Sequence, residues 1–600
     1  MLAIKQCRHA VPGGHAWCSK GGGPEQVSYN LCRNWRSPNC RKSAAKRWLR
    51  DSPGGLLFVE RYGVGSTLVA PIDDLARSGV GLVALYNARQ HNIETPKRMK
   101  TALKVTRQQD FAEWYQQVIK AADLAENAEV RGCMNIKPWG YAIWENIQQR
   151  FDKLLKATGH RNAYFPLLIP LRFFQQEAQH VEGFAKECAV VTHHRLALHE
   201  GTLVPDPDSK LEEPLVIRPT SETIIGDAFS RWIQSPKDLP LLINQWCNVM
   251  RWEMRTRLFL RTSEFLWQEG HTAHATSEEA IEEARLILQM YKDFVTDALC
   301  IPVIVGEKSA GERFPGAVNT WSIEGMMQDG KALQAGTSHF LGQNFSRAYK
   351  IKFGSSQGEQ FVWTTSWGIS TRLIGGLIMT HSDDNGLVLP PAISPVHLRV
   401  LLLTEDPAEA KRLRGFVEDA LAQQATNVCG EPLRTEYLTV GRRPGDSFWV
   451  AVKQGVPAIA QVGLREMDSG SISLTLRTDP QLQRQSVSHA SFLATLVTSL
   501  EDMQVSLRET ARAFREKNLV RPENLEALKA AFSDGDISPF ALCPVDVAAE
   551  SEEFAQLFLK EHKLSFRCLP EGELGILAAD AKCIFTGRAA THVALLAKSY

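Results

Sequence analysis

The sequence predicts an α+β protein of several domains, and three observations support this fold class. A chain of 600 residues is long enough for about three or four domains. Residues 251–271 look like two β-strands joined by a basic hairpin loop. Residues 111–122 and 276–295 instead carry apolar side chains at helical spacing. An apolar share of 44% and a charged share of 22% are ordinary for a globular protein.

The composition argues against a membrane protein and against a disulfide-rich secreted protein. No uninterrupted run of about eighteen apolar residues occurs, so no transmembrane helix is predicted. The 12 cysteines lack a dense disulfide spacing. This distribution is typical of a reducing compartment, and we expect a cytoplasmic protein.

Residues 1–98 differ from the rest of the chain. They hold 15 Lys and Arg against 6 Asp and Glu, whereas the remaining residues carry a net charge of −8. Apolar periodicity is weak before about residue 56. We interpret this segment as a disordered or artefactual extension, with Met99 as the true first residue; a cleaved organellar transit peptide is the alternative. Nucleic acid would have to bind the main body through local basic patches.

The first regular elements are expected soon after Met99. The apolar residues between Phe111 and Ala122 recur every three or four positions and predict an amphipathic helix. Residues 164–170 read as a short apolar strand bounded by prolines. Thr276 and Glu279 have the spacing of a capping box, which predicts the start of a helix at this point.

Residues 251–271 carry the most informative pattern. If this segment is extended, alternate side chains share a face. Several unpaired charges on a dry face would each cost several kcal/mol. Two guanidiniums can grip phosphate or carboxylate oxygens, and carboxylates can accept from an amino group. The pattern therefore predicts a site for a nucleotide phosphate and a small zwitterion, with a solvated, ion-paired sheet face as the alternative. The residues concerned are Arg251, Glu253, Arg261, Trp267, Glu269 and His271.

A strand at 359–367 is expected to lead through Ser370 into an apolar helix that begins near Arg372. Gly375 and Gly376 lie inside this helix, and each costs about 1 kcal/mol relative to alanine. Close packing of the helix on a sheet would compensate for this cost.

Four segments together resemble prolyl-tRNA synthetases, most closely the archaeal and eukaryotic-like type that some bacteria also have. The resemblance extends from Met99 to the last residue. Within it, residues 164–170 are similar to motif 1 of class II synthetases, the Arg251 hairpin to motif 2 and the Arg372 segment to motif 3. The four segments are Leu-Val-Ile-Arg-Pro-Thr-Ser-Glu-Thr (215–223), the block 251–274, Gln-Ala-Gly-Thr-Ser-His (334–339) and Ser-Trp-Gly-Ile-Ser-Thr-Arg (366–372).

The resemblance implies a domain order and an assembly. Residues 99–390 would form a class II catalytic domain on a six-stranded antiparallel sheet, and the enzyme would be a homodimer joined through the motif 1 region. Residues 391–498 would form an α/β anticodon-binding domain, and 499–600 a small α+β C-terminal domain. About eighty residues separate Pro170 from Arg251, too few for the editing domain of bacterial-type enzymes. We therefore expect no editing insertion.

The resemblance also assigns the amino-acid site. Alone, Thr220 would read as a helix N-cap and His339 as a buried core histidine. Within the family pattern, Thr220 and Glu222 match a loop that binds the secondary ammonium of proline, and Arg251 matches the arginine that holds its carboxylate. The complete L-proline set is Thr220, Glu222, Arg251, Trp267, Glu269, His271 and His339.

ATP is the second implied substrate, and Mg²⁺ is the implied cofactor, with Gln334 as a metal contact. Arg251 and Arg372 are the residues expected to promote catalysis. Gln334 and His339 are five positions apart, so one flat strand cannot aim both side chains the same way, and we expect a β-bulge or a strand end there. The implied ATP-binding set is Arg251, Glu253, Arg261, Thr262, Gln334, Thr337, Ser370 and Arg372.

The implied reaction is ATP-dependent activation of L-proline to prolyl-adenylate, followed by transfer to the 3′ end of tRNA(Pro). A non-catalytic synthetase paralogue with a binding or regulatory role is the alternative. Such paralogues typically lose the motif 2 or motif 3 arginine, and both are retained here. Threonyl and histidyl enzymes lack this combination of motifs.

Two regions depart from the family pattern. The strand after Gly-Val-Pro (455–457) has Gln461 where the family has a glutamate, which puts base reading by that residue in doubt. Of four cysteines around a C-terminal zinc, Cys543 and Cys583 remain, while Ala548 and Phe585 occupy the other positions. Two thiolates rarely hold structural zinc, so none is expected. The family's final tyrosine is present as Tyr600.

Overall fold

The computed structural model describes residues 102–600 apart from 176–186, 357, 423–425, 442–443, 534 and 536. The chain divides into a unit Met1–Met99 and a unit Lys100–Tyr600. The predicted N-terminal extension, residues 1–98, therefore lies outside the described residues. Among the helices that are described, none has the length and apolar character needed to cross a membrane.

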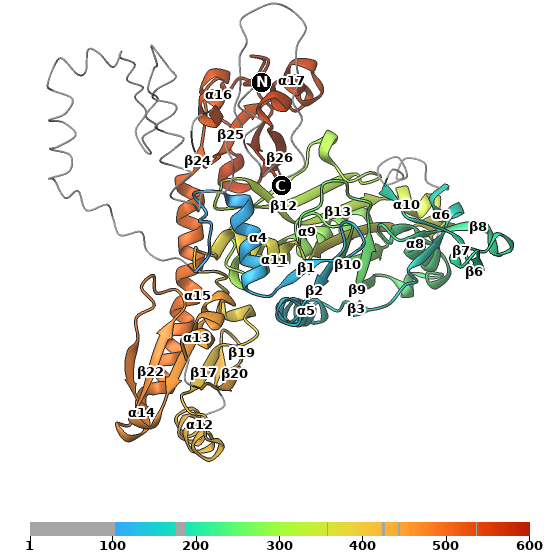
Figure 1. Cartoon of the computed structure of the whole chain (residues 1–600). Coiled ribbons are helices and arrows are strands. Elements are labelled where there is room, and N and C mark those ends of the chain that lie inside the picture. The colour runs from blue at the N-terminus through green and yellow to red at the C-terminus, as the bar shows by residue number, and fades with distance from the viewer. Residues whose placement is uncertain are drawn as a thin grey trace, which may run out of the picture. The chain divides into compact units, whose positions relative to one another are not determined.

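An eleven-stranded sheet is the centre of the second unit, in the order β24-β25-β27-β26-β11-β12-β13-β16-β10-β9-β3 (Figure 1). Six consecutive strands of it are antiparallel to their neighbours, as expected for a class II catalytic sheet. They are β11 (Val303–Glu307), β12 (Asn319–Met326), β13 (Ala332–Gly342), β16 (Trp363–Ser370), β10 (Glu264–His274) and β9 (Leu241–Met250), with β3 (Arg161–Asn162) parallel to β9 at the edge.

The predicted helices cover this sheet. Helix α4 (Phe111–Ala121) begins at Asp110, whose side chain accepts from two backbone N–H groups of the first turn. Helix α9 (Ser277–Asp297) begins with the predicted capping box, which is confirmed. It packs on β13, where Ser338 Oγ donates to the Ala284 carbonyl (2.8 Å). Helix α5 (Pro138–Ala157) is also part of the main hydrophobic core.

Helix α11 (Arg372–His381) follows β16 directly, as predicted. A Cβ atom on Gly375 would lie 2.5 Å from Leu260 Cδ2, and one on Gly376 would lie 2.9 Å from Leu333 Cδ2 on β13. The two glycines therefore allow the close packing that was inferred from their cost in a helix.

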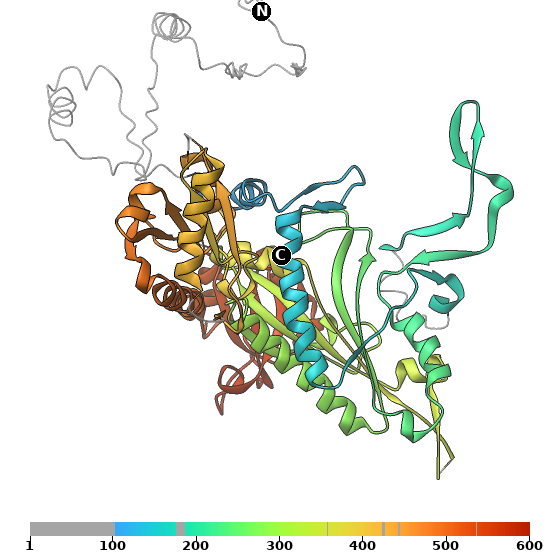
Figure 2. The ribbon, with the colours of Figure 1, turned by 90° about the horizontal axis from the view of Figure 1, so that it is seen from below.

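The motif 1 strand is shorter than predicted. Only β4 (Leu168–Pro170) is extended, because prolines cannot donate to a ladder and one of them interrupts the segment at position 166. The strand pairs with β8 (Lys210–Ile217), which also pairs with β5 (Val190–His193). A separate hairpin of β6 (Leu196–His199) and β7 (Thr202–Pro205) extends this arm (Figure 2). Short α6 (Leu171–Gln175) and α8 (Glu222–Trp232) complete the region.

A second sheet has five strands and its own core, in the segment expected to bind the anticodon. Strands β20, β17 and β21 are parallel, which gives the predicted α/β character. The Gln461 side chain on β21 is buried, and within the described part of the chain neither of its polar atoms has a hydrogen-bond partner. The elements are β17 (Leu398–Leu402), α12 (Pro407–Leu421), β20 (Thr435–Thr439), α13 (Pro444–Lys453), β21 (Ala458–Val462), α14 (Leu464–Asp468), β22 (Ser471–Leu476) and β23 (Gln485–Ser488).

The C-terminal strands continue the catalytic sheet, which the sequence did not predict. Strand β26 pairs with β11, so that Gly306 faces Pro570 and Glu307 faces Leu569. The C-terminal elements are α15 (Phe492–Lys517), β24 (Leu519–Val520), α16 (Leu525–Ser533), β25 (Phe540–Val545), α17 (Glu553–His562), β26 (Ser565–Pro570) and β27 (His592–Ala597).

Candidate active site

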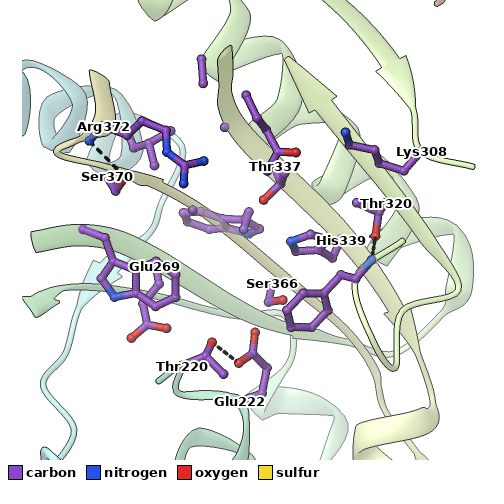
Figure 3. Close-up of a pocket in the computed structure, with 18 of the residues that line it drawn as sticks. Thr220, Glu222, Glu269, Lys308, Thr320, Thr337, His339, Ser366, Ser370 and Arg372 are labelled. Carbon is purple, nitrogen blue, oxygen red and sulfur yellow. Dashed lines mark hydrogen bonds between the residues drawn. The ribbon is translucent and has the colours of Figure 1, made fainter. Parts of the chain in front are cut away.

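Two adjoining cavities lie along the catalytic sheet, and we name them by their charged groups. The carboxylate cavity contains Glu222 and Glu269 among aromatic and imidazole side chains (Figure 3). The guanidinium cavity is lined by four arginines and by Glu187, Glu253 and Glu312. Four of the predicted residues line both cavities: Arg251, Gln334, Ser370 and Arg372.

Every site residue predicted from the sequence lines one of these cavities. Thr220, Glu222, Trp267, Glu269, His271, Thr337 and His339 lie in the carboxylate cavity, and Glu253, Arg261 and Thr262 lie in the guanidinium cavity.

The interpretation of residues 251–271 as one continuous strand face was wrong in part. Strand β9 ends at Met250 and β10 begins at Glu264, so Arg251, Glu253 and Arg261 lie in the connecting loop. The chain turns back on itself there, with the Arg257 N–H donating to the Arg261 carbonyl (2.6 Å). Alternation along β10 therefore explains only why Trp267, Glu269 and His271 share a face. The β9–β10 loop brings the arginines to the same two cavities.

Glu269 is the centre of a buried polar cluster. Its Oε1 accepts from Ser221 Oγ (2.5 Å) and Gln245 Nε2 (2.7 Å), and its Oε2 lies 3.0 Å from His271 Nε2. Burial lowers the pKa of His271, but the hydrogen bond and charge of Glu269 outweigh it, and the net shift is upward. Both carboxylate oxygens are occupied, so Glu269 positions His271 and leaves little capacity for a ligand.

Glu222 is the second carboxylate of this cavity, and its side chain points into the open space (Figure 3). Its Oε2 accepts from Thr220 Oγ1 at 2.5 Å. Thr220 is not the helix N-cap, because Ser221 occupies that position of α8. Burial lowers the pKa of Arg251, while Glu222 is the first of the acidic groups that oppose this shift. Glu222 and Arg251 thus provide opposite charges within one cavity.

His339 and Phe314 form an aromatic wall. Their rings stack with centroids 4.5 Å apart, and His339 Nδ1 lies 3.0 Å from Thr320 Oγ1. Burial is the main cause that lowers the pKa of His339 to about 4, so the ring is neutral at pH 7. A neutral ring beside a phenyl ring suits an apolar ligand surface.

The predicted bulge between Gln334 and His339 is confirmed. Gln334 faces Glu324 of β12, whereas Gly336 faces Ile323, which leaves Ala335 as the additional residue on β13. This shift brings the side chains of Gln334 and His339 to the same cavity.

Sequence reasoning missed several lining residues, namely Lys308, Glu312, Arg313, Phe314, Thr320 and Ser366. Most belong to the irregular segment 308–320, where no periodic pattern indicates a direction. Ser366 could have been found, because it shares the alternation of β16 with Ser370. Its hydroxyl has no hydrogen-bond partner among the described residues.

Two arginines of the guanidinium cavity donate to backbone carbonyls. Arg251 Nε donates to the Pro219 carbonyl (3.0 Å) and its guanidinium lies 5.5 Å from the Trp267 ring centre. Arg372 Nε donates to the Leu260 carbonyl (3.1 Å). Burial, followed by the charges of Arg251 and other arginines, lowers the pKa of Arg372 to about 10. Four arginines around one cavity, of which Arg251 and Arg372 are half-buried and Arg567 is buried, indicate a site for a polyanion.

The six-stranded antiparallel sheet, with arginines contributed by the β9–β10 loop and by the start of α11, defines a class II aminoacyl-tRNA synthetase. A model of the tRNA synthetase class II core domain (G, H, P, S and T) matches residues 206–381.

Comparisons with known proteins that cover most of the chain identify the family within this class. The chain is 51% identical over 506 residues to the proline–tRNA ligase of Bdellovibrio bacteriovorus, covering 83% of this chain and 99% of that protein. It is 50% identical over 517 residues to the proline–tRNA ligase of Rhodopirellula baltica, covering 84% and 99%. A crystal structure of prolyl-tRNA synthetase from Cryptosporidium parvum, complexed with halofuginone and AMPPNP, matches with a TM-score of 0.75. Its identity is 33%, and the match covers 83% of this chain and 97% of that one. The chain belongs to the proline–tRNA ligase family, and the predicted fold class and enzyme class are confirmed.

Proposed function

We propose that the two cavities bind L-proline and ATP side by side, form prolyl-adenylate and deliver the prolyl group to the 3′ end of tRNA(Pro). The observation that carries this proposal is the shared boundary: Arg251, Gln334, Ser370 and Arg372 line both cavities. A zwitterion in one cavity and a polyphosphate in the other would meet at these side chains.

In the amino-acid half, Glu222 is the partner for the secondary ammonium of proline, because its carboxylate faces the cavity. Trp267 and His339 border the pyrrolidine ring, and the Glu269–His271 pair fixes the cavity floor. Arg251 holds the proline carboxylate. A carboxylate and an ammonium attract strongly when both are removed from water.

In the nucleotide half, Glu253, Arg261, Thr262 and Ser370 surround the nucleotide, and Arg372 neutralises its phosphates. Thr337 contributes to ATP binding from the adjoining carboxylate cavity. Arg251 brings two mutually repelling anions, the proline carboxylate and the α-phosphate, into line for attack. Pyrophosphate leaves, and the terminal ribose hydroxyl of the tRNA then attacks the acyl carbon. No side chain forms a covalent intermediate.

Mg²⁺ fits the donor set at the boundary. It prefers oxygen ligands, and both Gln334, with its amide oxygen, and Glu312, with its carboxylate, line both cavities. When bound, the ion would screen the charge of the phosphates.

Proline-dependent exchange of pyrophosphate into ATP tests this function, because it reports amino-acid choice and activation together. We expect exchange with L-proline and much weaker exchange with alanine or cysteine. No exchange with any amino acid would favour the non-catalytic alternative, although the retention of Arg251 and Arg372 gives that alternative no support.

The archaeal and eukaryotic-like type without an editing domain is also proposed. The described part of the segment between Pro170 and Arg251 is occupied by α6, β5 to β9 and α8. We expect the purified protein not to hydrolyse Ala-tRNA(Pro), and hydrolysis would contradict this assignment.

A homodimer is proposed from the motif 1 arm. Leu196, Leu198 and Leu203 on the β6–β7 hairpin are 60%, 72% and 64% exposed, and such an apolar surface is typical of an interface. Sedimentation equilibrium should give twice the chain mass. A monomer at micromolar concentration would contradict the proposal.

A zinc-free C-terminal domain is proposed as well. Cys543 is buried and its pKa is raised by burial. Phe585, at a former ligand position, packs against Phe558 and Phe566. A phenyl ring cannot bind zinc, so elemental analysis should find less than about 0.1 equivalent per chain. One equivalent would overturn this reading.

Cytoplasmic location remains a proposal that follows from the substrates, since ATP, proline and tRNA meet where proteins are made. Fusion of residues 1–98 to a fluorescent reporter tests it, and import into an organelle would contradict it.

A further inference from the structure

Arg567 on β26 belongs to the C-terminal domain but lines the guanidinium cavity. The pairing of β26 with β11 places it there, because it makes the C-terminal strand an extension of the catalytic sheet. Ser565, Ser599 and Tyr600 line the same cavity. The nucleotide half of the site is therefore closed by the C-terminal domain.

A single buried carboxylate holds Arg567 in place. Glu324 Oε2 accepts from Arg567 Nε (3.1 Å) and Nη2 (2.9 Å). The other oxygen, Oε1, accepts from Lys308 Nζ at 3.1 Å. Lys308 lines the carboxylate cavity. Two cations thus share one carboxylate, so the group keeps a net positive charge, with one cation directed to each cavity.

The third nitrogen of Arg567 contacts another residue that lines the guanidinium cavity. Nη1 donates one long hydrogen bond to Ser565 Oγ, at 3.3 Å. Guanidiniums bind phosphate best with two parallel N–H groups. The charge of Arg567 also contributes to lowering the pKa of Arg372, after burial, Arg251 and Arg261. Arg567 therefore acts on the same part of the cavity as the motif 3 arginine.

We propose that Arg567 is a further binding residue for the β- and γ-phosphates of ATP, and for the pyrophosphate released from it. The C-terminal domain would then act directly in amino-acid activation. This inference depends on the proposed function, because it assumes that the guanidinium cavity takes the polyphosphate end of ATP.

The test compares AMPPNP with AMP, which lacks the β- and γ-phosphates, by calorimetric titration of the full chain. In Arg567→Gln, Glu324 keeps Lys308 as a partner, so no buried carboxylate is left unpaired. We expect AMPPNP to bind about 10- to 100-fold more weakly, which is typical of losing a charged hydrogen bond. AMP affinity and the KM for proline should stay within about twofold, since neither ligand carries the missing phosphates.

Glu571→Gln is the matched control. Glu571 forms an exposed ion pair with Arg285 of α9. This pair also joins the C-terminal domain to the catalytic domain, but neither residue lines either cavity. This variant should bind both nucleotides as the wild type does. Arg567→Lys keeps the positive charge but removes the parallel N–H groups of the guanidinium. Its affinity for AMPPNP should fall by a smaller factor than in Arg567→Gln.

Unchanged AMPPNP affinity in Arg567→Gln, or an equal loss for AMP and AMPPNP, would overturn the inference. If the Gln variant does not fold, Arg567→Lys decides: AMPPNP affinity equal to that of the wild type refutes phosphate binding. A wild-type chain that shows no proline-dependent exchange would instead defeat the proposed function, which separates the two failures.

Discussion

His271 Nε2 lies 3.0 Å from Glu269 Oε2, and both buried side chains line the carboxylate cavity. The other oxygen of Glu269 is occupied by Ser221 and Gln245. Glu222, which faces the same cavity, is thus the better candidate for binding a ligand's ammonium group. In the proposed function, Glu269 builds the site and Glu222 binds the substrate.

Glu222→Gln should therefore weaken the binding of proline selectively. Loss of the charge removes the attraction to the ammonium but keeps the side-chain volume and the contact with Thr220. We expect the KM for proline to rise about 10- to 100-fold, while the KM for ATP changes less than about threefold. Steady-state pyrophosphate exchange measures both. Equal increases in the two constants would show that the substitution disturbs the whole site.

Stability should depend on pH through His339. Its folded-state pKa of about 4 lies below the unfolded value of about 6.5. Between these values the unfolded chain takes up a proton that the folded chain does not. The stability that neutral His339 provides is therefore complete above pH 6.5 and is lost as the pH falls toward 4.

Urea unfolding at pH 7.5 and pH 5 measures this effect. The wild type should lose about 2 kcal/mol more than His339→Asn between the two values. His271 has the opposite sign, because its pKa is raised and its contribution disappears as the pH rises. Parallel losses in the wild type and His339→Asn would contradict the assignment to His339.

Gly270 lies against the ring of Trp367 on the adjacent strand, which leaves no room for a side chain at position 270. A Cβ at position 270 would lie 1.9 Å from Trp367 Cη2. The ring is enclosed, with Tyr291 and His160 against its edges. Gly270→Ala should cost about 1 to 3 kcal/mol by overpacking, measured by urea unfolding.

Gly415→Ala is the control for this substitution. A Cβ at this position on α12 meets no atom within 4 Å, so alanine should stabilise the helix by up to about 1 kcal/mol. If Gly270→Ala were equally harmless, the packing of Trp367 against β10 would have to be different.

Local patterns predicted the parts of the fold that depend on neighbours in sequence. The capping box at Thr276 and the start of α11 after Ser370 follow from local sequence patterns. The bulge near Gln334 follows from spacing once the family resemblance places Gln334 and His339 in one site. The apolar spacing of residues 276–295 predicts one buried face of α9, but Ile281 is 36% exposed, because it lies at the edge of the apolar stripe.

Long-range relationships were not visible in the sequence. The pairing of β26 with β11 joins segments more than 250 residues apart, and only two residue pairs define it. No pattern in Ser565–Pro570 distinguishes an edge strand from one that extends another sheet. The loop position of Arg251 was missed for a related reason: alternation continues through a turn in the sequence even when the backbone leaves the ladder.

The central claim is that Arg251 joins the two cavities and aligns the proline carboxylate with the α-phosphate. Proline-dependent pyrophosphate exchange by Arg251→Ala tests it most directly, with Arg231→Ala as control, an exposed arginine on α8 that pairs with Asp227. We predict a loss of at least about 1000-fold in Arg251→Ala, because a group that stabilises developing charge is removed, with an unchanged melting temperature and normal exchange in the control. A folded Arg251→Ala variant with near-normal exchange would contradict the account.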